Sequence, residues 1–193
     1  MSISAILLAD FLSEGASPAL YPFDDERTLI EWQVDALMEA GVRDIEVVLG
    51  PGADRIVPLV SRDGVEPIVN PRWQTDAASG IRVGTSAVPR GTEFALMLRV
   101  DQPRPAAICA RLLDEAPGSG PDLTRPTADG RAGTPVVVNG RAIEALRNLR
   151  ERTELNDLAS RFTARDVPFE SKLVTESIAS AEALRELRER YGF

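Results

Sequence analysis

The stretch Phe94-Ala-Leu-Met-Leu-Arg-Val100, followed directly by Asp101-Gln102-Pro103, is the most informative part of this 193-residue sequence. Its first seven residues are almost all apolar. That pattern is typical of a strand in a parallel sheet whose two faces are both covered by helices. The polar Asp-Gln-Pro ends the run, so we predict a strand over 94–100 that opens to solvent at residue 101.

The segments on either side alternate between strand and helix patterns. Strands are predicted over 4–9, 44–49, 65–69 and 136–138, with a short strand near Leu123 and an extended segment over 167–174. Helices are predicted over 26–40, 53–61, 77–87, 105–116, 142–149, 153–162 and 181–191. This alternation predicts one α/β domain over 1–193, with a Rossmann-like three-layer arrangement and a mostly parallel sheet between helices on both faces. Residues 117–134, rich in Gly, Pro, Asp and Thr, are predicted to form a loop-rich lobe.

The composition excludes several classes of chemistry. The chain has no histidine, so Ser-His-Asp and Cys-His catalysis and histidine-containing zinc sites are ruled out. Lys172 is the one lysine among 22 basic residues, and the net charge of −8 argues against a general nucleic-acid-binding surface. No apolar run approaches the roughly 18 residues of a membrane span. A single cysteine, Cys109, fits a reducing environment, and we predict a cytoplasmic location.

Asp101 is the leading candidate for a functional residue. It follows the most apolar strand, at the sheet edge where ligands of α/β proteins collect. A carboxylate in that position can hold Mg²⁺, which neutralises phosphate charge. The alternative is a helix cap or a turn residue before Pro103.

The loop from Asp10 to Pro18 is the next candidate, because nucleotide-binding α/β proteins often place a Gly-rich turn after the first strand. Here the loop has one glycine, Gly15, so an ordinary connection is the favoured alternative. Trp73 fits a pocket wall or core packing, and Cys109 fits a small buried apolar residue. Arginines near predicted loops could meet a phosphate, although each alone also fits a solvated surface charge: Arg72, Arg82, Arg99, Arg125 and Arg131.

Taken in order, several motifs resemble the MobA/MocA-type nucleotidyltransferases, the family that transfers CMP or GMP in molybdenum-cofactor synthesis. The similar segments cover most of the chain and are Pro18-Ala-Leu-Tyr-Pro-Phe23, Ala40-Gly-Val-Arg-Asp-Ile-Glu-Val-Val-Leu-Gly50, Asn70-Pro-Arg-Trp73, Ser79-Gly-Ile-Arg-Val-Gly84, Val100-Asp-Gln-Pro103 and Asp129-Gly-Arg-Ala-Gly-Thr-Pro-Val136. The resemblance implies a nucleotide-diphospho-sugar transferase-like fold. It also implies Mg²⁺-dependent transfer of a nucleotide from CTP or GTP to a phosphorylated pterin-like acceptor.

The same resemblance implies roles for particular residues. Asp101 would hold Mg²⁺, no residue is assigned a catalytic role, and five residues would bind the nucleotide: Ala9, Gly15, Asn70, Ser79 and Arg82. The departures fall on the same machinery. The family's Leu-Ala-Ala-Gly reads Leu8-Ala9-Asp10-Phe11, Pro18 stands at the lysine position, and the segment 177–183 lacks the second metal carboxylate.

Phosphoryl-type transfer depends on positioning and on neutralising charge, so these losses predict an activity that is weakened or lost. The alternative from another class is a catalytically inactive binding or scaffold protein with a protein partner, in which Phe11 and Leu12 pack over the phosphate site. A sugar-nucleotide enzyme of related fold is a third possibility, although no motif of its own supports it.

Overall fold

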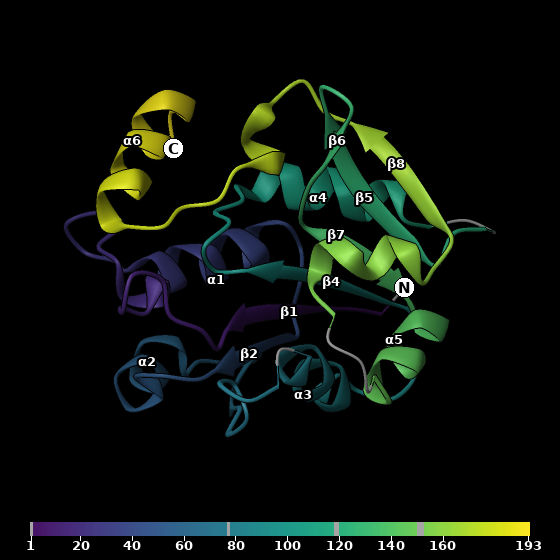
Figure 1. Cartoon of the computed structure of the whole chain (residues 1–193), viewed down its shortest axis with the longest axis horizontal. Coiled ribbons are helices and arrows are strands. Elements are labelled where there is room, and N and C mark those ends of the chain that lie inside the picture. Colours follow the sequence, from purple (N-terminus) through teal and green to yellow (C-terminus); the bar gives the residue numbers. More distant parts are fainter. Residues whose placement is uncertain (1, 77, 118–119, 150–152) are drawn as a thin grey trace.

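Four parallel strands form one half of the sheet in the computed structural model, which describes residues 2–76, 78–117, 120–149 and 153–193 (Figure 1). Their order is β3-β2-β1-β4, and their bounds are β1 Ile3–Ala9, β2 Ile45–Leu49, β3 Val65–Val69 and β4 Phe94–Arg99. Beyond β4 the direction changes, because β7 (Val136–Asn139) pairs with β4 antiparallel. The sheet continues through β5 (Leu123–Ala128), which pairs with β6 (Arg131–Ala132) and with β8 (Ala164–Pro168).

Helices cover both faces of this sheet, as the sequence predicts. Alternate residues of β1 point to opposite sides, so Ala5 and Leu7 pack in one apolar cluster and Ile6 and Leu8 in another. The first face is covered by α1 (Leu29–Glu39), α2 (Ala53–Val60), α4 (Ala106–Glu115) and α6 (Ala181–Tyr191). The second face is covered by α3 (Ser79–Ala87), α5 (Gly140–Arg147) and the 3₁₀ turn η2 (Leu155–Ser160). The predicted three-layer α/β fold is therefore confirmed.

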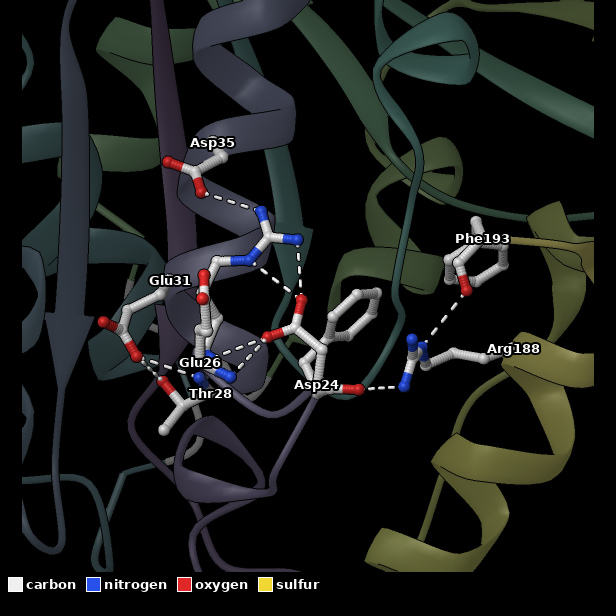
Figure 2. Close-up of polar contacts among 9 residues, drawn as sticks. Asp24, Glu26, Thr28, Glu31, Asp35, Arg188 and Phe193 are labelled. Atoms are coloured by element: carbon white, nitrogen blue, oxygen red, sulfur yellow. Dashed lines mark hydrogen bonds and ion pairs between the residues drawn. The ribbon is translucent and has the colours of Figure 1, made fainter.

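Helix α1 begins at Leu29 rather than at the predicted residue 26, because local hydrogen bonds end the preceding turn at Thr28. The Glu31 carboxylate accepts the backbone N–H and the hydroxyl of Thr28 at 2.8 and 2.7 Å. The Asp24 carboxylate accepts the backbone N–H of Arg27 at 2.7 Å. Figure 2 shows the carboxylates of Asp24 and Glu31. A capping box of this kind fixes where the first helical turn starts.

The end of the chain lies against the start of α1. The Phe193 ring stacks on Trp32 with ring centres 5.2 Å apart, and Trp32 stacks on Phe23 at 4.4 Å. Arg188 of α6 donates to the backbone oxygens of Phe23 and Phe193, as Figure 2 shows for Phe193. These contacts fix α6, and the segment leading into it reaches β4, where Ile178 N–H donates to the Asp101 carbonyl at 2.8 Å.

Arg104 ties the segment after β4 to two other parts of the chain from inside the core. The side chain is fully buried and donates to the carbonyls of Thr134, Val174 and Glu176 at 2.7 to 3.0 Å. It also donates to the Thr134 hydroxyl and to the Pro103 carbonyl. Burial lowers the pKa of this guanidinium to about 10, so it remains charged at neutral pH.

Other segments also differ from the sequence prediction, and the helix predicted over 153–162 is the 3₁₀ turn η2 (Leu155–Ser160). Within 117–134, of which residues 118 and 119 lie outside the described residues, the short strand predicted near Leu123 is the six-residue β5, which pairs with β7 and β8. The predicted extended segment 167–174 is the end of β8 followed by a 3₁₀ turn, η3 (Lys172–Thr175). The Ser171 hydroxyl accepts the Leu173 N–H and starts that turn, a local hydrogen bond that apolar patterning does not reveal. The predicted helix start at residue 77 also lies outside the described residues.

The two outer strands of the sheet, β3 and β8, each contain a proline. Pro67 lies in the middle of β3, next to the exposed Glu66, and Pro168 is the last residue of β8. Proline has no N–H to offer a further strand and is tolerated at such edges. Among the described residues, no helix has the length and apolar character needed to cross a membrane.

Candidate functional site

Two adjoining cavities, of about 170 and 280 Å³, open at the carboxyl ends of β1 and β4. Both are lined by Arg99, Glu154 and Leu155, so together they form one cleft. The remaining lining residues come from β1 and the loop after it, the β3–α3 connection and the start of α3, the segment after β4, and the segments just before η2 and α6: Leu8, Asp10, Phe11, Trp73, Asp76, Gly80, Ile81, Asp101, Gln102, Thr153 and Ser177. This is the edge at which ligands bind in open α/β sheets.

Arg99 and Asp101 form an ion pair at the centre of the cleft. Arg99 Nε and Nη2 donate to the two Asp101 carboxylate oxygens at 3.0 and 2.9 Å, a two-pronged arrangement with high geometric specificity. The Phe11 ring lies 3.9 Å from the guanidinium carbon and stacks on it. Burial opposes the charge of Arg99, but the hydrogen bonds and charge of Asp101 outweigh it and raise the pKa of the guanidinium above its ordinary value.

Asp10 occupies the other end of the cleft, beside the start of α3. Its carboxylate accepts a hydrogen bond of 2.6 Å from Asn70 Nδ2, and the same amide nitrogen donates to the Ser79 hydroxyl at 2.7 Å. Gly80 lies so close to the carboxylate that a Cβ at that position would come within 3.0 Å of Asp10 Cγ. Burial raises the pKa of Asp10, although the Asn70 hydrogen bond and the charge of Arg99 act in the opposite direction. A negative group therefore already fills the space beside the first turn of this helix.

The loop after β1 is a tight turn rather than a wide cradle. Ser13 and Ala16 exchange backbone hydrogen bonds of 2.8 and 3.0 Å around Glu14 and Gly15. Glu14 and Gly15 both have positive φ, of 50° and 82°, a conformation in which glycine is favoured. The Ser13 hydroxyl donates to the Ala179 carbonyl at 2.8 Å, so the turn is fastened to the segment leading into α6.

The six site residues predicted from the sequence lie in different parts of the structure. Asn70 and Ser79 are buried in the hydrogen-bonded group with Asp10, and Asp101 lies in the cleft. Ala9 is fully buried beneath the cleft, and Gly15 is exposed in the turn; neither lines the two cavities.

Arg82, the sixth of these residues, lies on α3 outside the cleft. It forms an ion pair with Asp76 and donates to the Leu149 carbonyl at 2.9 Å. It lines a separate groove of about 570 Å³ beside β3, together with Asn70 and Ser79. The structure therefore brings Asn70 and Ser79 next to Asp10, and Asp101 next to Arg99.

Two of the cleft residues had no specific assignment from the sequence. Arg99 was one arginine among several, although its spacing of two from Asp101 at the end of a strand places both side chains on one face. Glu154 lies far along the chain, just before η2, and no local pattern connects it to β4. Trp73 lines the cleft, which settles the alternatives for that residue in favour of a pocket wall.

The residues of the cleft do not fit a divalent metal ion at Asp101 as they stand. Both carboxylate oxygens of Asp101 accept hydrogen bonds from Arg99. A doubly charged ion about 4 Å from a guanidinium would be repelled by about 8 kcal/mol at an effective dielectric constant of about 20. Within the ranges that the structure describes, no group of three or more Cys, Asp or Glu residues is arranged to hold a metal.

A parallel β3-β2-β1-β4 core with a cleft at its carboxyl edge defines the class of Rossmann-like nucleotide-binding α/β domains. Within this class, residues 15–182 match the MobA-like NTP transferase domain, and the chain belongs to that family. No curated protein matches the chain.

Solved structures show the same fold. Rv0371c from Mycobacterium tuberculosis H37Rv superposes with a TM-score of 0.82 at 20% identity, over 98% of each chain. The structure of Rv0371c in complex with manganese gives a TM-score of 0.80 at 20% identity, over 98% of this chain and 99% of that one. A nucleotidyl transferase from Methanothermobacter gives 0.79 at 19% identity, over 98% and 97%. These neighbours confirm the predicted nucleotidyltransferase-like fold.

Proposed function

We propose that this protein binds a nucleoside triphosphate in the cleft between β1, α3 and β4, and that its nucleotidyl transfer is weakened or lost. Membership of the MobA-like NTP transferase family supports the nucleotide as ligand. The reaction in question is the one the sequence resemblance implies, from CTP or GTP to a phosphorylated pterin-like acceptor. For the relatives, the proposed reaction includes a divalent ion, because Rv0371c forms a complex with manganese.

The observation that carries this proposal is the charge of the cleft. Its lining includes four carboxylates, Asp10, Asp76, Asp101 and Glu154, and among the described lining residues one cation, Arg99. Nucleotidyl transfer depends on fixed positive charge around the phosphates. The loss of one such donor typically slows a reaction about 10²- to 10³-fold. A cleft with this balance supplies little of that charge, so we expect slow transfer, and Arg99 is the residue left to attract a phosphate.

Each part of the cleft has a separate task in binding. The apolar and aromatic side chains of Leu8, Ile81 and Trp73 supply a wall against which a base can pack. Arg99 supplies charge-assisted hydrogen bonds to a phosphate. The buried Asn70–Ser79 pair holds the carboxylate of Asp10 in place and so fixes the acidic side of the cleft.

The direct test is isothermal titration of the protein with CTP, GTP and ATP. We expect one of them to bind, with an affinity that falls at least tenfold in Trp73→Ala, because the base loses its wall. Arg125→Gln, which removes an arginine outside the cleft paired with Asp166, is the matched control and should leave binding unchanged. Binding that is equal in wild type and Trp73→Ala would contradict this placement.

Turnover is tested by pyrophosphate release in the presence of the acceptor, compared with an active member of the family. We expect a rate at least 10²-fold lower, in line with the loss of one charge-stabilising donor. A rate equal to that of the active relative would refute the proposed weakening.

One observation favours the second candidate, a catalytically inactive binding or scaffold protein. Phe11 is stacked over Arg99, and the turn that follows is fastened through Ser13 to Ala179, so the side of the cleft that would admit phosphates is partly covered. On this alternative, wild-type protein binds no nucleotide, and Phe11→Ala, which uncovers the guanidinium, binds one. Equal binding by both proteins would exclude it.

A further inference from the structure

We infer that Arg99 is a built-in cation that takes the place of a divalent metal ion at Asp101, so that the cleft accepts an anionic ligand without such an ion. The inference begins with the hydrogen bonds of Asp101. Each of its carboxylate oxygens accepts one N–H of Arg99, so the positions that a metal would use are directed at the guanidinium instead.

The guanidinium is held in place from two directions. Asp101 binds one edge of its plane, and Phe11 covers one face at 3.9 Å. The aliphatic part of Arg99 continues from the last residue of β4, which is in register with Leu8 of β1. An arginine fixed by its edge and its face has little freedom to leave Asp101 when a metal ion arrives.

The same guanidinium retains donors for a ligand. It has five N–H groups, and the two bonds to Asp101 use one on Nε and one on Nη2. Among the described residues, no protein acceptor takes the remaining three. Because Arg99 lines both cavities, it borders the space into which these N–H groups can donate. Two N–H groups hold the guanidinium against Asp101, and the other three can donate hydrogen bonds to a phosphate oxygen.

The surrounding carboxylates explain why the position needs a cation. Asp10 and Glu154, in addition to Asp101, interact electrostatically with Arg99. Without the guanidinium, Asp101 would have both oxygens free in the field of two further carboxylates, and that negative charge attracts a divalent cation to the oxygens of Asp101. Arg99 and a divalent ion are therefore alternative occupants of one position.

The test is direct binding of Mn²⁺, measured by electron paramagnetic resonance and needing neither nucleotide nor activity. We expect wild-type protein to show no stoichiometric Mn²⁺ site, and Arg99→Leu to gain one with at least tenfold tighter binding. Adding Asp101→Asn to Arg99→Leu should abolish the gained site. Arg141→Leu is the matched control, because it removes an arginine from another buried carboxylate, Asp122, and should gain no site.

The outcomes separate this inference from the proposed function. A stoichiometric Mn²⁺ site in the wild type that disappears in Asp101→Asn would overturn the inference, whether or not Arg99→Leu folds. A folded Arg99→Leu protein with no gain would also overturn it.

The second arm rests on the proposed function and measures nucleotide affinity in EDTA and in Mg²⁺. We expect affinities equal within about twofold. Binding that requires Mg²⁺ would refute the inference while leaving the proposed function intact, whereas no binding in either buffer would refute nucleotide binding alone.

Discussion

Glu46 makes the stability of this protein depend on pH in a way that can be worked out from its surroundings. The residue lies in β2, its side chain is 3% exposed, and Oε2 has no hydrogen-bond partner. It is in register with Glu66 of β3 and lies near Asp44, so two further negative charges face it. Burial, reinforced by these charges, raises the pKa of Glu46 from 4.5 to about 8.

The native state therefore holds this proton more tightly than the unfolded chain does. Below pH 4.5 the carboxyl is protonated in both the native and the unfolded state, so it does not lower the free energy of unfolding. Between pH 4.5 and about 8 the free energy of unfolding falls as pH rises. Each pH unit of the difference corresponds to about 1.4 kcal/mol. Over the whole window of about 3.5 units the loss reaches about 5 kcal/mol, an order-of-magnitude value.

The perturbation is Glu46→Gln, which keeps the size of the side chain and removes its titration. Urea unfolding followed by circular dichroism from pH 5 to pH 9 should show the variant gaining stability over wild type as pH rises. The gain should amount to several kcal/mol above pH 8. Glu189→Gln, at an exposed position on α6 away from Glu46, is the control and should track the wild type closely. A constant difference between Glu46→Gln and wild type across this range would refute the reasoning.

Three further experiments test other parts of the structure. Arg104→Met removes the arginine donor from the carbonyls of Pro103, Thr134 and Glu176 and should destabilise the protein by about 3–5 kcal/mol in urea; a loss below 1 kcal/mol would contradict the account. Cys109 is fully buried, and burial raises the pKa of its thiol to about 12, so a thiol reagent should modify unfolded but not native protein. Gly80→Ala places a methyl group against the Asp10 carboxylate, and adding Asp10→Ala should relieve the loss; the double-mutant cycle should give a coupling of about 0.5–3 kcal/mol, and additive effects would rule out the contact.

The sequence predicts the central elements well because their patterns are local. The strand over 65–69 and the helix over 181–191 have the bounds expected from apolar spacing and flanking turns. The start of α1 was wrong by three residues, because it is set by the side-chain hydrogen bonds of Thr28 and Glu31 rather than by hydrophobic periodicity.

The candidate site is less accessible from the sequence. Asp101 was placed correctly at the sheet edge, since position after a buried strand is a local property. The sequence shows only that Arg99 and Asp101 are two residues apart, not that their side chains form an ion pair. Glu154 lies more than 50 residues further along the chain, and no local sequence pattern indicates that it lines the same cleft. The roles of Ala9, Gly15, Asn70, Ser79 and Arg82 in nucleotide binding remain predictions from family resemblance.

The prolines in the two outer strands affect how this protein behaves at high concentration. An open strand with a continuous row of free N–H and C=O groups recruits further strands and starts aggregation. Pro67 interrupts that row in the middle of β3, beside the charged Glu66, and Pro168 ends it in β8 after Arg165 and Asp166. Both outer strands therefore offer a further strand an interrupted row of backbone donors, which makes edge-to-edge association of two copies less favourable.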